Sequence, residues 1–131
     1  AARSAAKTLS VAILVRDRAQ EKVFSAALGG EATRLHRDLK VWNDGPGIYH
    51  GTYHAAKGLE FDVVIVPFLD VDNLPDKDYI ASHGEEDALT HDGRLLYVAA
   101  TRAKTNLILL YSGARTPLLP TDESLYQRVK P

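Results

Sequence analysis

The stretch that decides the fold is Gly51–Phe68, GTYHAAKGLEFDVVIVPF. Its last part, DVVIVPF, is an apolar and β-branched run of the kind that forms a buried parallel strand. A turn with Lys57, Gly58 and Glu60 precedes this run, and another β-branched run, IYHGTYH, precedes the turn. The stretch therefore predicts two strands joined by a glycine-containing turn. Backbone N–H groups and a lysine in such a turn can face an oxyanion.

A second stretch, RLLYVAATRAKTNLILLYSG, runs from Arg94 to Gly113. Together the two stretches resemble motifs V and VI of the superfamily 1 DNA helicases of the UvrD, Rep and PcrA type. Those helicases carry close variants of TxHxAKGLEFDxV and LLYVAxTRAK in this order. Motif V would cover about residues 51–67 and motif VI about residues 94–107. The resemblance implies the C-terminal, second RecA-like domain of such a helicase, an α/β fold with a mostly parallel sheet flanked by helices.

Composition is that of an ordinary globular protein. A chain of 131 residues, 45% hydrophobic and 25% charged, forms a single domain over residues 1–131. The absence of cysteine excludes disulfides and thiolate zinc sites and fits the reducing cytoplasm. No apolar run approaches the roughly 18 residues of a membrane span. With a net charge of −1, any contact with DNA must be local. The absence of methionine suggests a piece of a longer polypeptide.

The hydrophobic pattern alternates between strand and helix periods. Strands are predicted at Thr8–Val15, Thr33–Leu39, Ile48–His54, Val63–Phe68 and Asn106–Tyr111. Helices are predicted from Asp17 to a Gly29-Gly30 cap, at Arg94–Ala103 and from near Thr121, with a turn at Asn43–Gly47. Alternation of this kind favours an α/β domain with a mostly parallel sheet.

Residues 69–93 are polar and acidic, which predicts a solvated, mobile loop. Asp70 and Asp72 resemble the start of a calcium loop, but its later ligand positions carry Leu, Pro and Ala here. His83 and His91 have no third ligand at a zinc spacing, so they are interpreted as surface residues. We expect no metal site in this segment.

Arg102 is the charged residue whose predicted place in the helix Arg94–Ala103 needs an explanation. At about 100° per residue it falls inside the apolar arc. That arc contains Leu95, Leu96, Val98, Ala99, Ala100 and Ala103, and the opposite face carries Arg94, Tyr97 and Thr101. A guanidinium there must reach out at the helix end, meet an internal carboxylate, or point across an interface at an anion.

The resemblance to the helicases favours the last of these alternatives. It implies that Arg102 is an arginine finger that reaches the γ-phosphate of ATP bound against the partner domain. It further implies that Glu60 contacts the ATP ribose or its surroundings, and that Lys57 and Gly58 form the turn that links the ATP and DNA sites. Without the motif context, Glu60 would be a solvated charge and the turn a simple connection.

Thr52 and His54 match positions that touch single-stranded DNA in the same family. Taken alone, Thr52 would be a strand former and His54 a histidine of the core or its rim. The neighbouring motif residues make the DNA contact the better expectation.

Several helicase features are absent from this sequence. It contains no G-x-x-x-x-G-K-[ST] phosphate loop and no aspartate-glutamate magnesium motif. We therefore expect that the chain alone does not hydrolyse ATP, and that ATP with Mg²⁺ is bound mainly by the N-terminal RecA-like domain of the same polypeptide. Where relatives have EERR before motif VI, this chain has His91-Asp92-Gly93-Arg94, which leaves the start of that helix open.

The function expected from these motifs is that of the C-terminal motor domain of an ATP-dependent DNA helicase or translocase. It would complete the ATP site and contact single-stranded DNA. The alternative is a nucleotide-independent RecA-like interaction domain that has lost its motor partner, and a phosphate loop upstream of Ala1 would separate the two. A flavodoxin-like or receiver-type small-molecule domain is a further alternative, for which no residue here predicts a site.

Overall fold

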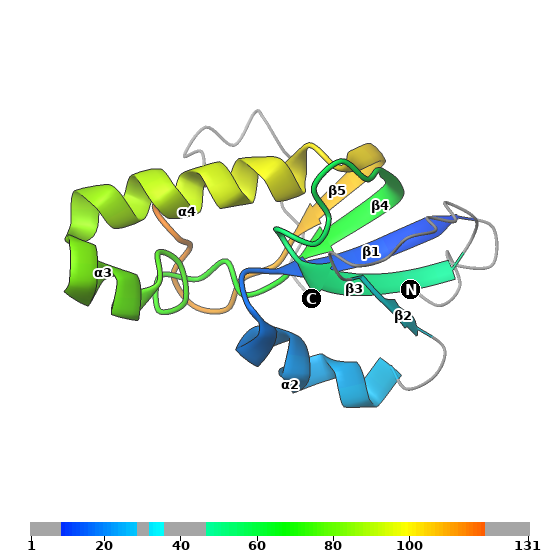
Figure 1. Ribbon diagram of the computed structural model, residues 1–131, viewed down its shortest axis with the longest axis horizontal. Coiled ribbons are helices and arrows are strands. Elements are labelled where there is room, and N and C mark those ends of the chain that lie inside the picture. The colour runs from blue at the N-terminus through cyan, green and yellow to red at the C-terminus, as the bar shows by residue number, and fades with distance from the viewer. Residues whose placement is uncertain (1–8, 29–31, 36–46, 120–131) are drawn as a thin grey trace.

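The computed structural model describes residues 9–28, 32–35 and 47–119. Its elements, in chain order, are β1 (Ser10–Val15), α2 (Arg18–Leu28), β2 (Ala32–Arg34), β3 (Gly47–Thr52), β4 (Phe61–Val66), α3 (Lys77–His83), α4 (Glu85–Ala100) and β5 (Ala103–Leu109). The strands form one parallel sheet in the order β2-β3-β1-β4-β5 (Figure 1). The predicted α/β fold is confirmed. Over the described ranges, none of the helices is long and apolar enough to span a membrane.

β1 is the central strand of the sheet. It suits this position because it is apolar on both faces. Val11, Leu14 and Val15 are fully buried, as in a strand that is covered from both sides. β1 pairs with β3 on one side and with β4 on the other. Two of the predicted strands, Thr8–Val15 and Val63–Phe68, nearly coincide with β1 and β4.

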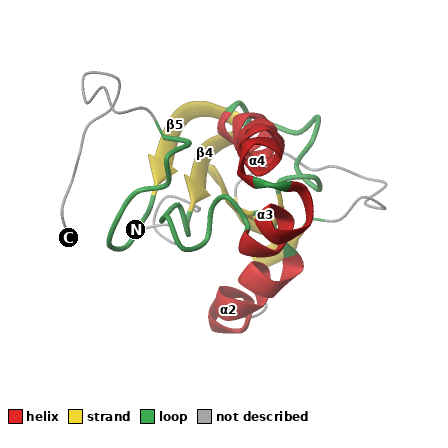
Figure 2. Cartoon of the chain, turned by 90° about the vertical axis from the view of Figure 1, so that its left-hand side faces the viewer, coloured by secondary structure: helices red, strands yellow, loops and turns green. Residues whose placement is uncertain are grey.

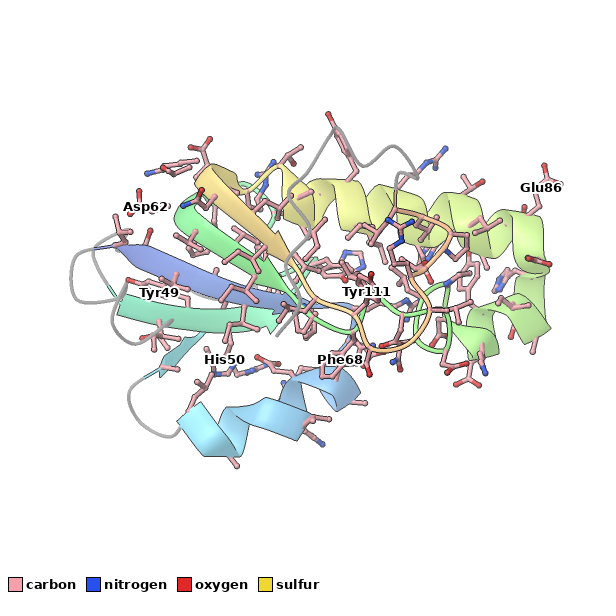
Figure 3. All side chains as sticks on the ribbon, turned by 180° about the vertical axis from the view of Figure 1, so that it is seen from behind. Tyr49, His50, Asp62, Phe68, Glu86 and Tyr111 are labelled. Carbon is pink, nitrogen blue, oxygen red and sulfur yellow. The ribbon has the colours of Figure 1, made fainter. Side chains whose placement is uncertain are left out.

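Helices α2 and α4 cover opposite faces of the sheet. Successive residues of a strand point to opposite faces. In β3, Tyr49 belongs to the same hydrophobic cluster as Leu96 of α4, whereas His50 bonds Glu21 of α2. Figure 2 shows α4 at the top and α2 at the bottom, with α3 between them. Figure 3 shows His50 directed toward α2.

The main hydrophobic core lies on the α4 side of the sheet. The rings of Tyr49 and Phe61 meet there with centroids 5.7 Å apart. The core contains Ala12, Leu14, Leu35, Tyr49, Tyr53, Ala56, Phe61, Val64, Val66, Leu69, Leu74, Leu96 and Ala99. Tyr53 and Ala56 come from the turn after β3, and Ala55 and Leu59 of the same turn pack against the core, so the turn is anchored there while His54, Lys57, Gly58 and Glu60 are exposed.

The prediction of a mobile loop over residues 69–93 is wrong. Asp76 caps α3 by accepting a hydrogen bond from the Tyr79 backbone N–H at 3.0 Å. The acidic run that follows forms the first turn of α4, which begins at Glu85 and not at Arg94. Carboxylates at this end are stabilised by the positive end of the helix dipole. The same charges that indicate a solvated loop therefore stabilise a helix start.

His83 and His91 lie on either side of the Tyr79 ring. Each imidazole stacks on that ring with centroids 4.2 Å apart. His83 is exposed, as expected, but His91 is half-buried and its Nδ1 lies 3.0 Å from Oδ1 of the buried Asp92. With 38% of its side chain exposed, His91 is a surface residue as interpreted, but its stacking on Tyr79 also joins α4 to α3.

The remaining boundaries shift or lie outside the described residues. The last strand is Ala103–Leu109, earlier than the predicted Asn106–Tyr111, because α4 also ends early. The strand predicted at Thr33–Leu39 is represented by Ala32–Arg34. The Gly29-Gly30 cap, most of the Asn43–Gly47 turn and the helix near Thr121 lie outside the described residues.

Gly51 marks a close approach between β3 and the chain that follows β2. A Cβ added to Gly51 would lie 2.9 Å from Cβ of the buried Leu35. Gly51→Ala should therefore lower the free energy of unfolding by about 1–3 kcal/mol, the usual cost of overpacking. Gly93→Ala in α4 is the control, since among the described residues its Cβ would meet only Leu118, at 3.5 Å, and it should be neutral or stabilise the helix by up to about 1 kcal/mol. Urea melts that show equal changes for both variants would contradict this packing.

Candidate functional site

Thr52 and His54 lie where the chain leaves the carboxyl end of β3. Thr52 is the last residue of the strand, and its Oγ1 accepts a hydrogen bond from the Ala55 backbone N–H at 3.3 Å. The prediction that the strand continues to His54 is wrong, because this bond and the Ala56 N–H bond to the Thr52 carbonyl start a turn. His54 is exposed in that turn. Both side chains lie at the carboxyl edge of the sheet.

The turn over residues 53–60 crosses from the carboxyl edge of the sheet, the end at which its parallel strands terminate, to the amino edge, the end at which they begin. Lys57 N–H donates to the His54 carbonyl at 3.2 Å, and Leu59 N–H donates to the Ala56 carbonyl at 3.0 Å. Gly58 has a φ of +84°, in the left-handed region that glycine adopts at little cost. Lys57, Gly58 and Glu60 are exposed.

Arg102 does not lie in the apolar arc of the helix, because α4 ends at Ala100. The arc itself is confirmed: Leu96 and Ala99 are buried and Tyr97 is 69% exposed. The Arg102 Nε donates to the Val98 carbonyl at 3.1 Å, and Nη2 donates to Thr101 Oγ1 at 3.1 Å. Among the described residues no carboxylate forms an ion pair with Arg102. Of the three alternatives, the internal carboxylate is therefore excluded within that part of the chain.

The structure brings Glu60 and Arg102 to the same edge of the sheet. Phe61, the residue after Glu60, donates its backbone N–H to the Arg102 carbonyl at 2.8 Å. Phe61 begins β4 and pairs in register with Ala103, which begins β5. Because all strands are parallel, these two positions share the amino edge. Of the predicted ATP residues, Glu60 and Arg102 therefore lie at the amino edge, while Lys57 and Gly58 lie in the turn that leads there from Thr52 and His54 at the carboxyl edge.

Three reciprocal hydrogen bonds between Ser10 and Asp62 join β1 to β4 at the amino edge. The Asp62 carboxylate accepts from the Ser10 backbone N–H at 2.9 Å and from its hydroxyl at 3.2 Å. The Asp62 backbone N–H donates to Ser10 Oγ at 2.9 Å. The Ser10 backbone N–H lowers the pKa of Asp62 most, and the hydroxyl and Lys104 lower it further. Figure 3 shows Asp62 at this edge and Glu86 at the far end of α4.

A buried ion pair at the carboxyl edge was not expected from the sequence pattern. Arg16 Nε lies 3.0 Å from Oδ1 of the fully buried Asp92. The other Asp92 oxygen accepts from the Asp76 backbone N–H at 2.7 Å. Burial and the nearby Asp92 raise the pKa of Tyr53, which packs beside this pair. The pair joins β1, the start of α3 and the middle of α4. In the sequence, the one indication of this ion pair is the charged Arg16 directly after a buried strand.

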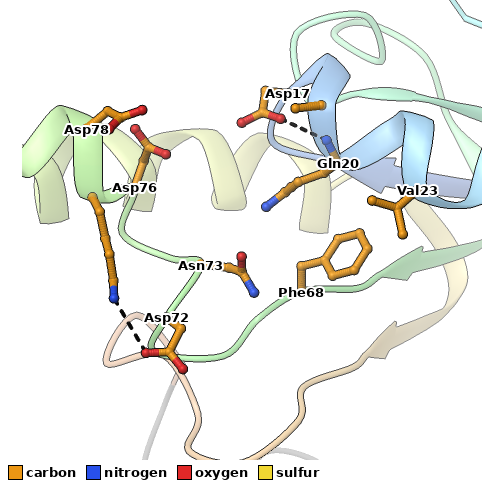
Figure 4. A pocket seen from close by; sticks show the side chains of 10 residues that line it. Asp17, Gln20, Val23, Phe68, Asp72, Asn73, Asp76 and Asp78 are labelled. Carbon is orange, nitrogen blue, oxygen red and sulfur yellow. Dashed lines mark hydrogen bonds and ion pairs between the residues drawn. The ribbon is translucent and has the colours of Figure 1, made fainter.

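A pocket of about 460 Å³ opens between the start of α2 and the segment that leads into α3 (Figure 4). Among the described residues that line it, the carboxylates of Asp17, Asp72, Asp76 and Asp78 face one cation, that of Lys77. None of the predicted site residues lines it. A triphosphate would be repelled there, so this pocket does not correspond to the candidate ATP site.

The five parallel strands with flanking helices define an α/β domain, and the two motifs lie around β3–β4 and α4–β5 of it. A family model, the UvrD-like helicase C-terminal domain, matches residues 31–114. The chain therefore belongs to the UvrD-like helicase C-terminal domain family, as the two motifs predict.

Proteins from distant organisms are similar to this chain. A DNA helicase II from Rickettsia typhi is 38% identical over 81 residues, which cover 62% of this chain and 12% of that protein. The ATP-dependent DNA helicase UvrD2 of Mycobacterium tuberculosis is 37% identical over 71 residues, or 54% of this chain and 10% of that protein. The ATP-dependent DNA helicase srs2 of Schizosaccharomyces pombe is 47% identical over 58 residues, or 44% and 6%. The chain thus spans a small part of these relatives.

A solved structure agrees with the fold. It is the C-terminal domain of a possible DNA helicase from Lactobacillus plantarum WCFS1, with a TM-score of 0.57 and 29% sequence identity. The similarity covers 82% of this chain and 59% of that one. The likeness extends beyond the two motifs to the arrangement of the sheet.

Proposed function

We propose that this chain is the C-terminal motor domain of an ATP-dependent DNA helicase or translocase. The observation that carries the proposal is the division of the motif residues between two edges of the sheet. Glu60 and Arg102 lie at the amino edge, Thr52 and His54 lie at the carboxyl edge, and the single turn over residues 53–60 connects them. A motor needs such a connection, because nucleotide and DNA must be bound at separate sites that move together.

The amino edge has the chemistry that a nucleotide phosphate requires. Arg102 has no carboxylate partner in the described chain, and its bonds to the helix end use Nε and Nη2 only. The Nη1 group is therefore left to donate to an anion. Lys57 and Gly58 are exposed on the turn that leads to Glu60. These residues fit ATP with Mg²⁺ held mainly by the N-terminal RecA-like domain of the same polypeptide, and hydrolysis of that ATP supplies the free energy for movement.

The carboxyl edge has hydrogen-bond donors that suit a nucleic-acid backbone. The Thr52 hydroxyl and the exposed His54 ring can donate to phosphate oxygens, contacts that position a strand without reading its sequence. The net charge of −1 means that this contact is local. Single-stranded DNA is the expected partner because the same residues match the DNA-contacting positions of motif V.

Closure of the two motor domains connects the edges. As Arg102 and Glu60 approach the bound nucleotide, the turn that ends at Glu60 moves with them. Its other end carries His54 and follows Thr52 directly. A displacement at the amino edge therefore shifts the DNA-contacting residues, and repeated closure and opening would advance the domain along the strand.

Separate substitutions at the two edges test this division in the parent helicase. Glu60→Ala should lower ATP hydrolysis both with and without single-stranded DNA, because it acts at the nucleotide. His54→Ala should leave the basal rate near that of the unsubstituted protein and lower mainly the DNA-stimulated rate, because it acts on the strand. Steady-state hydrolysis rates measured across a titration of single-stranded DNA separate the two effects.

Equal losses of basal and stimulated rates in both variants would reject the division of labour. For this rejection to hold, thermal or denaturant melts of the isolated chain must show that the Glu60→Ala and His54→Ala variants both remain folded. His83→Ala is a matched control, because this histidine is exposed on α3, away from both groups of motif residues, and it should change neither rate.

A further inference from the structure

The Arg102 guanidinium is held against the last turn of α4. Its Nε donates to the Val98 carbonyl and its Nη2 to Thr101 Oγ1, both at 3.1 Å. The carbonyl end of a helix is partially negative and attracts a cation. The last turn of α4 contains no basic residue of its own. Arg102, two residues beyond the helix, therefore supplies this cation.

The hydroxyl of Thr101 has a fixed direction. Its Oγ1 lies 3.0 Å from both the Tyr97 and the Val98 carbonyl oxygens. An arginine has no acceptor atom, so the hydroxyl proton must point to one of these carbonyls. A lone pair of Oγ1 is then directed at Arg102 Nη2. The branched Cβ of threonine restricts χ1 and keeps the hydroxyl in this place.

We propose that Thr101 is a positioning residue for Arg102. With Nε on Val98 and Nη2 on Thr101, the plane of the guanidinium is set before any ligand arrives, and Nη1 remains to meet an anion. Preorganisation of a charged donor lowers the reorganisation needed in the transition state. The inference rests on the proposed function, since it assigns Thr101 a role only if Arg102 acts on the nucleotide.

Thr101→Val and Thr101→Ser in the parent helicase test the inference. Valine keeps the shape of threonine but loses the hydroxyl, and kcat for ATP hydrolysis should fall about tenfold with little change in KM, as for the loss of a hydrogen bond to a charged group. Serine keeps the hydroxyl and should restore most of the rate. Thr90→Val is the matched control, because Thr90 Oγ1 also bonds a carbonyl one turn back, that of Glu86 at 3.2 Å, but lies far along α4.

A spectroscopic measurement on the 131-residue chain gives a readout that does not depend on turnover. The Nε–H proton of Arg102 should exchange with water several-fold faster in Thr101→Val than in the unsubstituted chain, because the guanidinium loses one of its two anchors. Thr90→Val and Thr101→Ser should exchange at the unsubstituted rate.

The outcomes separate the two proposals. Normal turnover in Arg102→Ala would remove the proposed function and this inference with it. Impaired turnover in Arg102→Ala combined with normal turnover and normal exchange in Thr101→Val would overturn the inference alone. An equal loss in the valine and serine variants would also overturn it, because the hydroxyl would then not be the group that matters.

Discussion

Arg102→Ala in the parent helicase should lower ATP turnover by about 10³-fold or more, the loss seen when an arginine finger is removed. The structure gives the reason for so large an effect. The guanidinium has no described internal carboxylate to neutralise it, and it lies at the sheet edge shared with Glu60. Under the proposed function, its charge is therefore available to the transition state that would form when the two motor domains close. Single-turnover hydrolysis of ATP in the presence of single-stranded DNA measures the loss.

Stability of the isolated chain should hardly respond to the same substitution. Arg102→Ala removes a contact with the helix end and should change the free energy of unfolding by less than about 1 kcal/mol. Arg94→Ala is the control for turnover, because Arg94 is exposed on the outer face of α4 and should leave the rate unchanged. A drop of several kcal/mol in Arg102→Ala would assign the residue to architecture instead of catalysis.

Asp92→Asn should be the most destabilising single change at the carboxyl edge. It removes the charge of a fully buried carboxylate that bonds Arg16 at 3.0 Å and the Asp76 backbone N–H at 2.7 Å. Breaking a buried pair from one side leaves the remaining charge uncompensated, so the free energy of unfolding should fall by about 3–5 kcal/mol. The weaker contacts of Arg16 with Asp17 at 3.7 Å and Asp76 at 3.9 Å place the effect at the lower end of this range.

The matched control is the same substitution at an exposed ion pair. Asp72 lies 3.6 Å from Lys77, and their side chains are 83% and 67% exposed. Asp72→Asn should change stability by less than about 1 kcal/mol, the usual value for a surface pair. Denaturant melts that give similar losses for both variants would mean that the buried pair does not hold α4 to β1.

The sequence predicted the sheet better than the helices that surround it. β1 and β4 are nearly continuous runs of Val, Ile and Leu, and a central parallel strand leaves a pattern of this kind because both of its faces are buried. The start of α2 was predicted equally well. Asp17 is a residue type that caps helices, and it accepts a hydrogen bond from the Gln20 backbone N–H at the start of α2.

Helices α3 and α4 were obscured by their polarity. Before Asp92, the only buried residue of α4 is Ala88. The helical spacing of apolar residues therefore becomes visible in the sequence only near Leu96. No residue of α3 is buried. Such helices are stabilised by caps and by contacts with one another, for example the stacking of Tyr79 on His91, which a local pattern does not contain.

The motif resemblance names candidate site residues, which stay predictions, but it does not give their geometry. The motif resemblance identifies Arg102 and Glu60, but only the structure shows that a backbone bond from Phe61 to Arg102 brings their positions together. The contact between Arg16 and Asp92 joins residues 76 positions apart, and no local signal specifies a pairing at that distance. The three-residue difference in the end of α4 changed the expected environment of Arg102 from an apolar helix face to a helix terminus.

The central claim is that the amino edge of this sheet completes an ATP site. The most direct measurement is a crystal structure of the parent helicase with single-stranded DNA and ADP with aluminium fluoride, a mimic of the transferring phosphate. The account predicts the Arg102 guanidinium within hydrogen-bond distance of the fluoride ligands, at about 3 Å, with Glu60 beside the ribose and Thr52 and His54 against the DNA backbone. A closed complex in which Arg102 still rests only on the Val98 carbonyl, remote from the nucleotide, would contradict it.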